Sequence, residues 1–435
     1  MDLVEATSWL SQRIDYEARS SARADISAGK IDGLSLDAMT SLVEVLGNPH
    51  HNYPVIHVTG TNGKGSTVQM ITELLVAMGL HVGSFTSPHV VAVNERFRTN
   101  GEEISDEDLA AVLTDLRLFS EDLEPQPSYF EMLTAGALQW FSDIAVDVAV
   151  VEVGLLGRYD ATNVVDGQVA VVTSIGTDHT DGQGDFRRKI AQEKAGIITP
   201  TSTLILGEPD PELYSVFEAE GPAAIKWVRR DFGATNHRLA VGGSMVDVFA
   251  RERYEDVFVS LLGEHQGANA AVAIAAVEEF FDRPVPEDVV EEALGKVNLP
   301  GRFEVVSADP LIVLDAAHTP EAAAAVQTTL AEHMGVGSSR VFVIGMLTGR
   351  DPGEFMEALG VGGGDFVIAT APDSERAMPA TDVADAASAA GASAEVATPV
   401  AEALDRATSV VEAEEPILVV GSFYVVGEAK AALAL

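Results

Sequence analysis

The chain has 435 residues, 47% of them hydrophobic, so it is long enough for two or three domains with sizeable cores, and disorder is not expected. Asp and Glu number 67 against 27 Lys and Arg, giving a formal net charge of −40. Such a charge repels nucleic acids and anionic membranes, so neither is expected as a partner.

The acidic residues are spread along the chain rather than gathered in a tail. This pattern predicts a halophilic protein from a salt-rich cytoplasm, where screening shortens the range of self-repulsion. The absence of cysteine excludes disulfides and thiolate metal sites and is typical of cytosolic proteins. The N-terminus shows no leader pattern, and no run of about 18 apolar residues occurs. We therefore expect a cytoplasmic protein without a membrane span, and a monomer.

Short apolar runs alternate with helical patterns in the first half of the chain. Residues 55–58 predict a buried strand, followed by a helix with one apolar face made by Val68, Ile71, Leu74, Leu75 and Met78. Further buried strands are predicted at residues 147–153, 169–174 and 204–206. Alternating patterns at 244–249 and 257–262 predict a small antiparallel sheet.

A second series of strands begins near residue 300. Its strands are predicted at 311–314, 341–344, 366–369 and 417–420, with helices between them such as 320–332 and 381–390. The alternation indicates an α/β fold with parallel sheets covered on both faces. We predict a hinge at 298–302, a larger N-terminal domain over 1–297 with a mostly parallel sheet, and a smaller Rossmann-like α/β domain over 298–435.

A glycine-rich loop separates the first strand from its helix. Its sequence is Gly60-Thr61-Asn62-Gly63-Lys64-Gly65-Ser66. Glycines admit phosphate close to the backbone, the helix N-terminus supplies free N–H groups, and Lys64 adds a positive charge. The strict phosphate-loop pattern is not met, because Gly65 separates Lys64 from Ser66 and residue 58 is Val. The alternative is a plain glycine-rich turn.

With Gly65 in this place, the loop resembles that of folylpolyglutamate synthase and dihydrofolate synthase, which belong to the Mur ligase superfamily. Further motifs match that family in order, over nearly the whole chain. They are residues 86–89 and 94–96, 130–134, 151–163, 173–179, 193–196, 265–269, 300–304, 314–318 and 421–424.

The resemblance implies a magnesium centre beside the loop. Glu152 ends a predicted strand and His179 follows another, so both could lie at the ligand-binding edge of a parallel sheet. The family pattern assigns Glu152 and His179 to Mg²⁺, with Ser66 and Ser87 as oxygen ligands and two metal sites. Considered singly, Glu152 could equally be a capping or ion-paired carboxylate, and His179 a hydrogen-bonded loop residue.

Lys194 occupies the place of a lysine that CO₂ carbamylates in the family. Burial favours the neutral amine that this reaction needs. The resemblance thus implies an anionic oxygen ligand for magnesium at Lys194. The alternative is a surface helix lysine paired with Glu193, Asp185 or Asp181.

The second half supplies the remaining residues that the resemblance implies. Asn269 would read the adenine edge, and Arg302 would reach the ATP phosphates. Asp315 and His318 would position ATP and the incoming amine. Asp315 could instead cap the helix that follows Thr319.

The implied activity is ATP-dependent addition of L-glutamate to dihydropteroate, to folates or to both, through an acyl phosphate. Phe130 would lie near the pterin, and Asp160 would lie at the dihydropteroate site, although a core Phe and a capping Asp are alternatives. Another Mur-type amide ligase with a different acceptor and a non-catalytic nucleotide-binding switch are rival functions. The chain departs from the family at Leu156, where glycine is common, and at Thr319, where asparagine is common.

Overall fold

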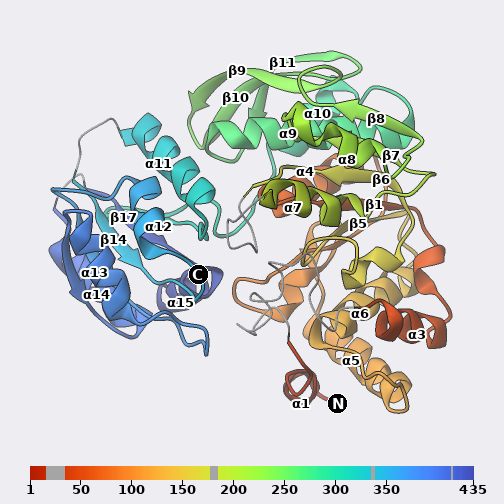
Figure 1. Cartoon of the computed structure of the whole chain (residues 1–435), viewed down its shortest axis with the longest axis horizontal. Helices are drawn as coiled ribbons and strands as arrows, with labels where there is room; N and C mark the ends of the chain where they lie inside the picture. Colours follow the sequence, from red (N-terminus) through yellow and green to blue (C-terminus); the bar gives the residue numbers. More distant parts are fainter. Residues whose placement is uncertain (16–34, 177–184, 335–338, 413–414) are drawn as a thin grey trace.

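The computed structural model describes residues 1–15, 35–176, 185–334, 339–412 and 415–435. Figure 1 shows two lobes, with strands β1, β5, β6 and β7 in one and strands β14 and β17 in the other. Each lobe contains its own β-sheet, and a third, smaller sheet lies against the first lobe.

The first sheet has eight strands in the order β4-β3-β2-β5-β1-β6-β7-β8. The pairs β2–β3 and β3–β4 are antiparallel, and all other neighbouring strands are parallel. The predicted strands are confirmed as β1, β5, β6 and β7. The strands are β1 Val55–Thr59, β2 Val82–Phe85, β3 Phe97–Thr99, β4 Glu102–Glu103, β5 Val148–Glu152, β6 Gly167–Val172, β7 Thr203–Leu206 and β8 Ala224–Trp227.

Helices cover both faces of this sheet, as continuous apolar strands require. Ile56 and Val58 of β1 face one core, which includes the predicted apolar face of α4, while Val55 faces the other. Met78 lies just after the end of α4 and is half-buried. The first face carries α4 Lys64–Ala77, α9 Glu264–Phe281 and α10 Glu287–Leu294, and the second carries α1 Leu3–Leu10, α3 Asp37–Val45, α5 Asp106–Ser120 and α6 Tyr129–Asp143.

The predicted antiparallel sheet is confirmed. It has three strands in the order β11-β10-β9, with bounds β9 Gly233–Ala240, β10 Gly243–Phe249 and β11 Arg253–Val259. The expected strand at 257–262 was placed too late, because β11 ends at Val259. The other short elements of this lobe are η1 Pro49–His51, η2 Val93–Arg96, η3 Ala161–Val164, α7 Phe186–Ala195, η4 Pro211–Leu213 and α8 Tyr214–Glu218.

The second lobe has a six-stranded sheet in the order β12-β13-β17-β14-β15-β16. The strand β12 pairs antiparallel at one edge, and the other pairs are parallel. Four strands match their predicted bounds, whereas β12 and β16 were not predicted. The elements are β12 Glu304–Ala308, β13 Leu311–Leu314, α11 Pro320–Met334, β14 Val341–Ile344, α12 Pro352–Leu359, β15 Phe366–Ala369, α13 Ala380–Ala389, β16 Ser393–Val396, α14 Val400–Val410, β17 Ile417–Val420 and α15 Phe423–Ala432.

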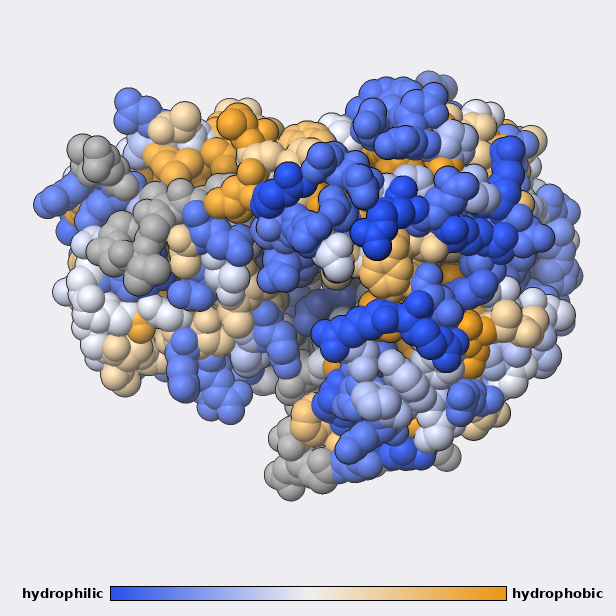
Figure 2. Space-filling model, turned by 90° about the horizontal axis from the view of Figure 1, so that it is seen from above, coloured by the Kyte–Doolittle hydropathy of each residue, from blue (hydrophilic) through white to orange (hydrophobic). Residues whose placement is uncertain are grey.

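The lobes touch where the loop after β2 meets α15 and the segment before β12. Val90 contributes to the apolar core of the second lobe, and its carbonyl oxygen lies 2.1 Å from where a Cβ on Gly427 would be. Figure 2 shows a hollow between the two lobes on the face seen from above. Among the described residues, no helix is long and apolar enough to cross a membrane.

Candidate active site

The glycine-rich loop lies between the end of β1 and the start of α4, at the carboxyl edge of the parallel strands. Gly63 precedes the helix with φ +84°, a conformation that favours glycine. A Cβ at Gly63 would lie 2.5 Å from the side-chain oxygen of Asn269, and one at Gly60 would lie 1.8 Å from Thr173 Oγ1. These close contacts require both glycines. They also show that Asn269, near the start of α9, lies directly against the loop.

Two lysine side chains converge on this loop. Lys64 Nζ donates a hydrogen bond to the carbonyl oxygen of Gly60 at 3.0 Å and to that of Thr61 at 3.3 Å. Lys194 Nζ donates to the same Gly60 oxygen at 2.8 Å. Lys194 is 2% exposed, so the alternative of a surface lysine is wrong. The site therefore brings two ammonium groups to the position expected for phosphate.

Glu152 faces the loop from the end of β5. It is 3% exposed, and its Oε2 lies 3.7 Å from where a Cβ on Gly65 would be. The same oxygen accepts a hydrogen bond from the backbone N–H of Ser87 at 3.3 Å, so Glu152 also fixes the segment after β2. Ser66 is buried in the first turn of α4. One carboxylate and two serines thus gather beside the loop.

This donor set fits magnesium, which prefers oxygen ligands and is commonly held by one or two carboxylates together with substrate phosphates. Among the described residues, no group of three or more His, Asp or Glu side chains is arranged so that it could hold a metal ion. A metal here would therefore be held by Glu152, by Ser66 and Ser87, and by the substrate. His179 lies outside the described residues.

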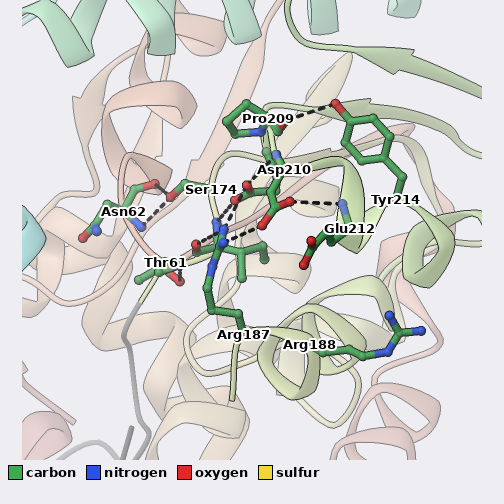
Figure 3. A network of polar contacts seen from close by, with 12 residues as sticks. Thr61, Asn62, Ser174, Arg187, Arg188, Pro209, Asp210, Glu212 and Tyr214 are labelled. Carbon is green, nitrogen blue, oxygen red and sulfur yellow. Dashed lines mark hydrogen bonds and ion pairs between the residues drawn. The ribbon is translucent and has the colours of Figure 1, made fainter. Parts of the chain in front are cut away.

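The segment after β6 is tied to the tip of the loop (Figure 3). Asn62 N donates to Ser174 Oγ at 3.1 Å, and Asn62 O accepts from Thr173 Oγ1 at 2.6 Å. Thr61 N donates to Ser174 O at 2.9 Å, and Gly176 N donates to Thr61 Oγ1 at 3.0 Å. No role was predicted for Thr173 and Ser174. Their position directly after a buried strand is the signal that could have indicated one.

Arg302 brings positive charge from the hinge. It is half-buried, and its guanidinium lies 4.7 Å from the ring centroid of Phe423. Burial lowers the pKa of Arg302, while the negative charges of Asp315 and Glu152 act in the opposite direction. Glu152 belongs to the first lobe and Asp315 to the second. Arg302 therefore lies within the electrostatic reach of both lobes.

Asp315 follows β13 and fixes the hinge. Its carboxylate accepts hydrogen bonds from the backbone N–H groups of Phe303 and Ala317, both at 2.7 Å. Burial raises the pKa of Asp315, whereas Arg302 and these two hydrogen bonds lower it. The alternative in which Asp315 caps α11 is wrong, because Thr319 Oγ1 accepts from Ala322 N at that helix start. The threonine thus supplies a capping oxygen in place of asparagine.

His318 lies beside the same aromatic ring as Arg302. Its ring centroid is 5.8 Å from that of Phe423, and its Nδ1 is 2.8 Å from the carbonyl oxygen of Ala316. Because that oxygen can only accept, this hydrogen bond requires a proton on Nδ1 of His318.

Phe130 and Asp160 lie together under the loop that follows β5. Phe130 is 8% exposed, and a Cβ on Gly154 would be 2.4 Å from its ring. Asp160 is 5% exposed and accepts hydrogen bonds from Leu155 N and from Thr162. Burial raises its pKa to about 6. Asp160 therefore stabilises the loop to which it belongs. This is the capping role that was the alternative to a substrate-binding role.

Family models match both lobes. The Mur ligase middle domain matches residues 58–277, and the Mur ligase glutamate ligase domain matches residues 301–423. The dihydrofolate synthase/folylpolyglutamate synthase of Mycobacterium tuberculosis is 37% identical over 339 residues, which are 72% of this chain and 69% of that protein. The chain belongs to the folylpolyglutamate synthase/dihydrofolate synthase family. The family resemblance inferred from the ordered motifs is thus confirmed.

Solved structures of family members share the whole architecture. A structure of Mycobacterium tuberculosis folylpolyglutamate synthase complexed with ADP and AMPPCP has a TM-score of 0.90 and 33% identity, covering 100% of this chain and 98% of that one. A bifunctional family member with Mn, AMPPNP and L-glutamate bound has a TM-score of 0.85 and 30% identity, covering 100% and 98%. The predicted α/β fold class is therefore confirmed.

Two halophilic archaeal relatives are much longer than this chain. The Halobacterium salinarum protein named probable bifunctional folylpolyglutamate synthase/dihydropteroate synthase is 36% identical over 413 residues, which are 91% of this chain and 49% of that protein. The protein of the same name in Haloferax volcanii gives 34% identity over 91% of this chain and 48% of that protein. The chain thus spans about half the length of these relatives.

Proposed function

We propose that the protein is an ATP-dependent ligase that joins L-glutamate to dihydropteroate, to folates or to both. The observation that carries the proposal is the convergence of Lys64, Lys194 and buried Glu152 on the glycine-rich loop, with Arg302 at the hinge within the electrostatic reach of Glu152. The names of the relatives support the acceptor class, and the L-glutamate and ATP analogues bound in solved relatives support the other two substrates.

The proposed reaction has two steps, activation of the acceptor carboxylate and attack by the glutamate amine. A carboxylate is a poor electrophile, so the acceptor carboxylate first attacks the γ-phosphate of ATP, which forms an acyl phosphate and releases ADP. The amine of glutamate then attacks the acyl carbon, and phosphate leaves. Lys64 and Arg302 stabilise the negative charge of the transferring phosphoryl group, and the loop N–H groups hold the adjacent phosphates. Asp315 and His318 are proposed to position the glutamate amine beside it.

The metal proposals extend the same site. We propose two Mg²⁺ sites held by Ser66, Ser87, Glu152 and His179, and magnesium would supply charge neutralisation at the phosphates. We further propose that Lys194 is carbamylated, which its burial favours. A crystal structure grown with bicarbonate and Mg²⁺ tests this. Electron density for a bare amine at Lys194 would reject the modification and leave Lys194 as a phosphate-binding cation.

Substrate contacts outside the phosphates are also proposals. We propose that Asn269 contacts adenine, and its place against Gly63 supports a contact near the nucleotide. Phe130 and Asp160 are proposed at the pterin and dihydropteroate sites, and their shared position under the loop of Gly154 and Leu155 supports a joint role. The division into 1–297 and 298–435, the monomeric state and the cytoplasmic location stay predictions.

The decisive experiment uses labelled glutamate, ATP and Mg²⁺ in high KCl, with dihydropteroate or tetrahydrofolate as acceptor. We expect label in at least one product, and loss of that label in Glu152→Gln but not in Glu107→Gln, an exposed carboxylate on α5. ATP turnover with some other acceptor alone would favour another Mur-type amide ligase. Nucleotide binding with no turnover for any acceptor would favour a non-catalytic switch.

A further inference from the structure

A cluster of one basic and two acidic side chains, outside the motifs that match the family, lies behind the phosphate-binding loop. It consists of Arg187 on α7 with Glu208 and Asp210, which follow β7. Arg187 Nη2 is 3.0 Å from Glu208 Oε1, and its Nη1 is 2.6 Å from Asp210 Oδ2. The three side chains meet beside the segment after β6, as Figure 3 shows for Arg187 and Asp210. We call them the Arg187 clamp.

The clamp holds both backbone polar groups of one residue of that segment, Ile175. Glu208 Oε2 accepts the backbone N–H of Ile175 at 2.8 Å, and Arg187 Nη2 donates to the carbonyl oxygen of Ile175 at 3.2 Å. The remaining oxygen of Glu208 also accepts from Asp210 N at 2.9 Å. Glu208 is only 3% exposed, and a buried carboxylate is retained at low cost only when it is paired and fully hydrogen-bonded.

The gripped segment leads directly to the phosphate-binding loop. The residue after Ile175 is Gly176, whose N–H donates to Thr61 Oγ1 at 3.0 Å. Thr61 N in turn donates to Ser174 O at 2.9 Å. The clamp is therefore two hydrogen-bonded steps away from the loop backbone that Lys64 contacts.

Helix α7 is hydrogen-bonded to the loop near one end and to the segment after β6 near the other. Arg187 and Lys194 are seven residues apart, which is two helical turns, so their side chains leave the same face. Lys194 reaches Gly60 O at one end, and Arg187 holds Ile175 at the other. A shift of α7 would move Lys194 and the loop together. The guanidinium fork suits this task because it contacts two carboxylates and one carbonyl at once.

We infer that Arg187, Glu208 and Asp210 are positioning residues for nucleotide binding: they hold the segment after β6 and the helix that carries Lys194 in register with the phosphate-binding loop. None of the three contacts the loop itself, so they act through Ile175, Gly176 and Thr61. The inference rests on the proposed function only in requiring that the loop binds ATP.

The test measures binding of a non-hydrolysable ATP analogue with Mg²⁺ by calorimetry in high KCl, and the KM for ATP where turnover is found. We expect Arg187→Met to weaken binding by about tenfold, the lower end of the effect known for residues that orient metal ligands from the outer shell. Arg187→Lys keeps the charge but not the fork, so it should recover only part of the loss. Binding of the ATP analogue needs no acceptor, so the role of the clamp can be tested even if the protein does not ligate glutamate. Wild-type protein that binds the analogue but ligates no glutamate would overturn only the proposed function.

The matched control is Arg188→Met, the next residue on the same helix. Arg188 is exposed, its side chain points away from the clamp in Figure 3, and its loss changes the net charge equally. Equal nucleotide affinity in Arg187→Met, Arg188→Met and wild type would overturn the inference. If Arg187→Met does not fold, Asp210→Asn decides by the same criterion, because it removes one contact of Arg187 and leaves Glu208 in place. A lower melting temperature with unchanged affinity would show a merely structural role and would also overturn it.

Discussion

Asp160 is a buried carboxylate whose titration should appear directly in the stability of the protein. Burial raises its pKa from 3.8 to about 6. An acid whose pKa is higher in the folded state keeps its proton up to a higher pH when the protein is folded. The folded state therefore loses stability as pH rises from about 4 to about 6, and the loss stays constant above that. The difference in pKa corresponds to about 3 kcal/mol, at ~1.36 kcal/mol per pH unit.

Replacing Asp160 with Asn removes this titration but also one hydrogen bond. The amide oxygen can still accept from Thr162, as Oδ1 does now, but the amide nitrogen cannot accept from Leu155 N. That loss costs about 1–3 kcal/mol at every pH. We expect Asp160→Asn to be less stable than wild type by that amount at pH 4. Between pH 4 and 7 the difference should move by about 3 kcal/mol in favour of the variant.

Urea unfolding at constant high KCl, followed by tryptophan fluorescence, measures this difference. All three tryptophans, Trp9, Trp140 and Trp227, belong to the part of the chain that holds Asp160. Asp122→Asn, at an exposed carboxylate, is the control and should follow wild type at each pH. A difference between Asp160→Asn and wild type that does not change between pH 4 and 7 would refute the reasoning.

Three further predictions follow from the backbone, the lobe contact and the charge. Leu156 has φ +61°, so Leu156→Gly should be about 1 kcal/mol more stable than Leu156→Ala by urea unfolding, the reverse of the usual order; equal stability would contradict the strain. Gly427→Ala places a methyl group 2.1 Å from Val90 O and should lower kcat at least tenfold, while Gly362→Ala, with open space around it, should not. The melting temperature should rise with KCl, because screening relieves the repulsion of a −40 chain, and a maximum at low salt would reject the halophilic interpretation.

The fold was most predictable where strands are buried on both faces. The strands β13, β14, β15 and β17 are runs of apolar residues, and the structure places them at their predicted bounds. The edge strands β12 and β16 were missed because their side chains are largely exposed and carry no continuous apolar run. Such strands form because a neighbour offers a free edge, which is a property of the assembled sheet rather than of the segment.

In the candidate site, too, residues were predictable where the signal is local in the sequence and were missed where only packing places them. The phosphate-binding loop has a local signal, since its glycines, lysine and flanking strand and helix are adjacent in sequence. The burial of Lys194 has none, because a helix such as 186–195 contains several charged residues and only packing decides which of them turns inward. The Arg187 clamp was not predicted for the same reason. Glu208 and Asp210 lie 21 and 23 residues after Arg187, and only the folded sheet brings the three together.

The charge distribution explains how such an acidic chain could bind anions. A net charge of −40 opposes the approach of ATP and glutamate, yet Lys64 and Lys194 contact the loop and Arg302 lies near Glu152. Screening acts on these charges unequally. The Debye length falls to about 3 Å at 1 M salt, so distant acidic side chains lose their influence while cations in direct contact with phosphate keep theirs. A salt-rich medium would therefore remove the repulsion without removing the binding site.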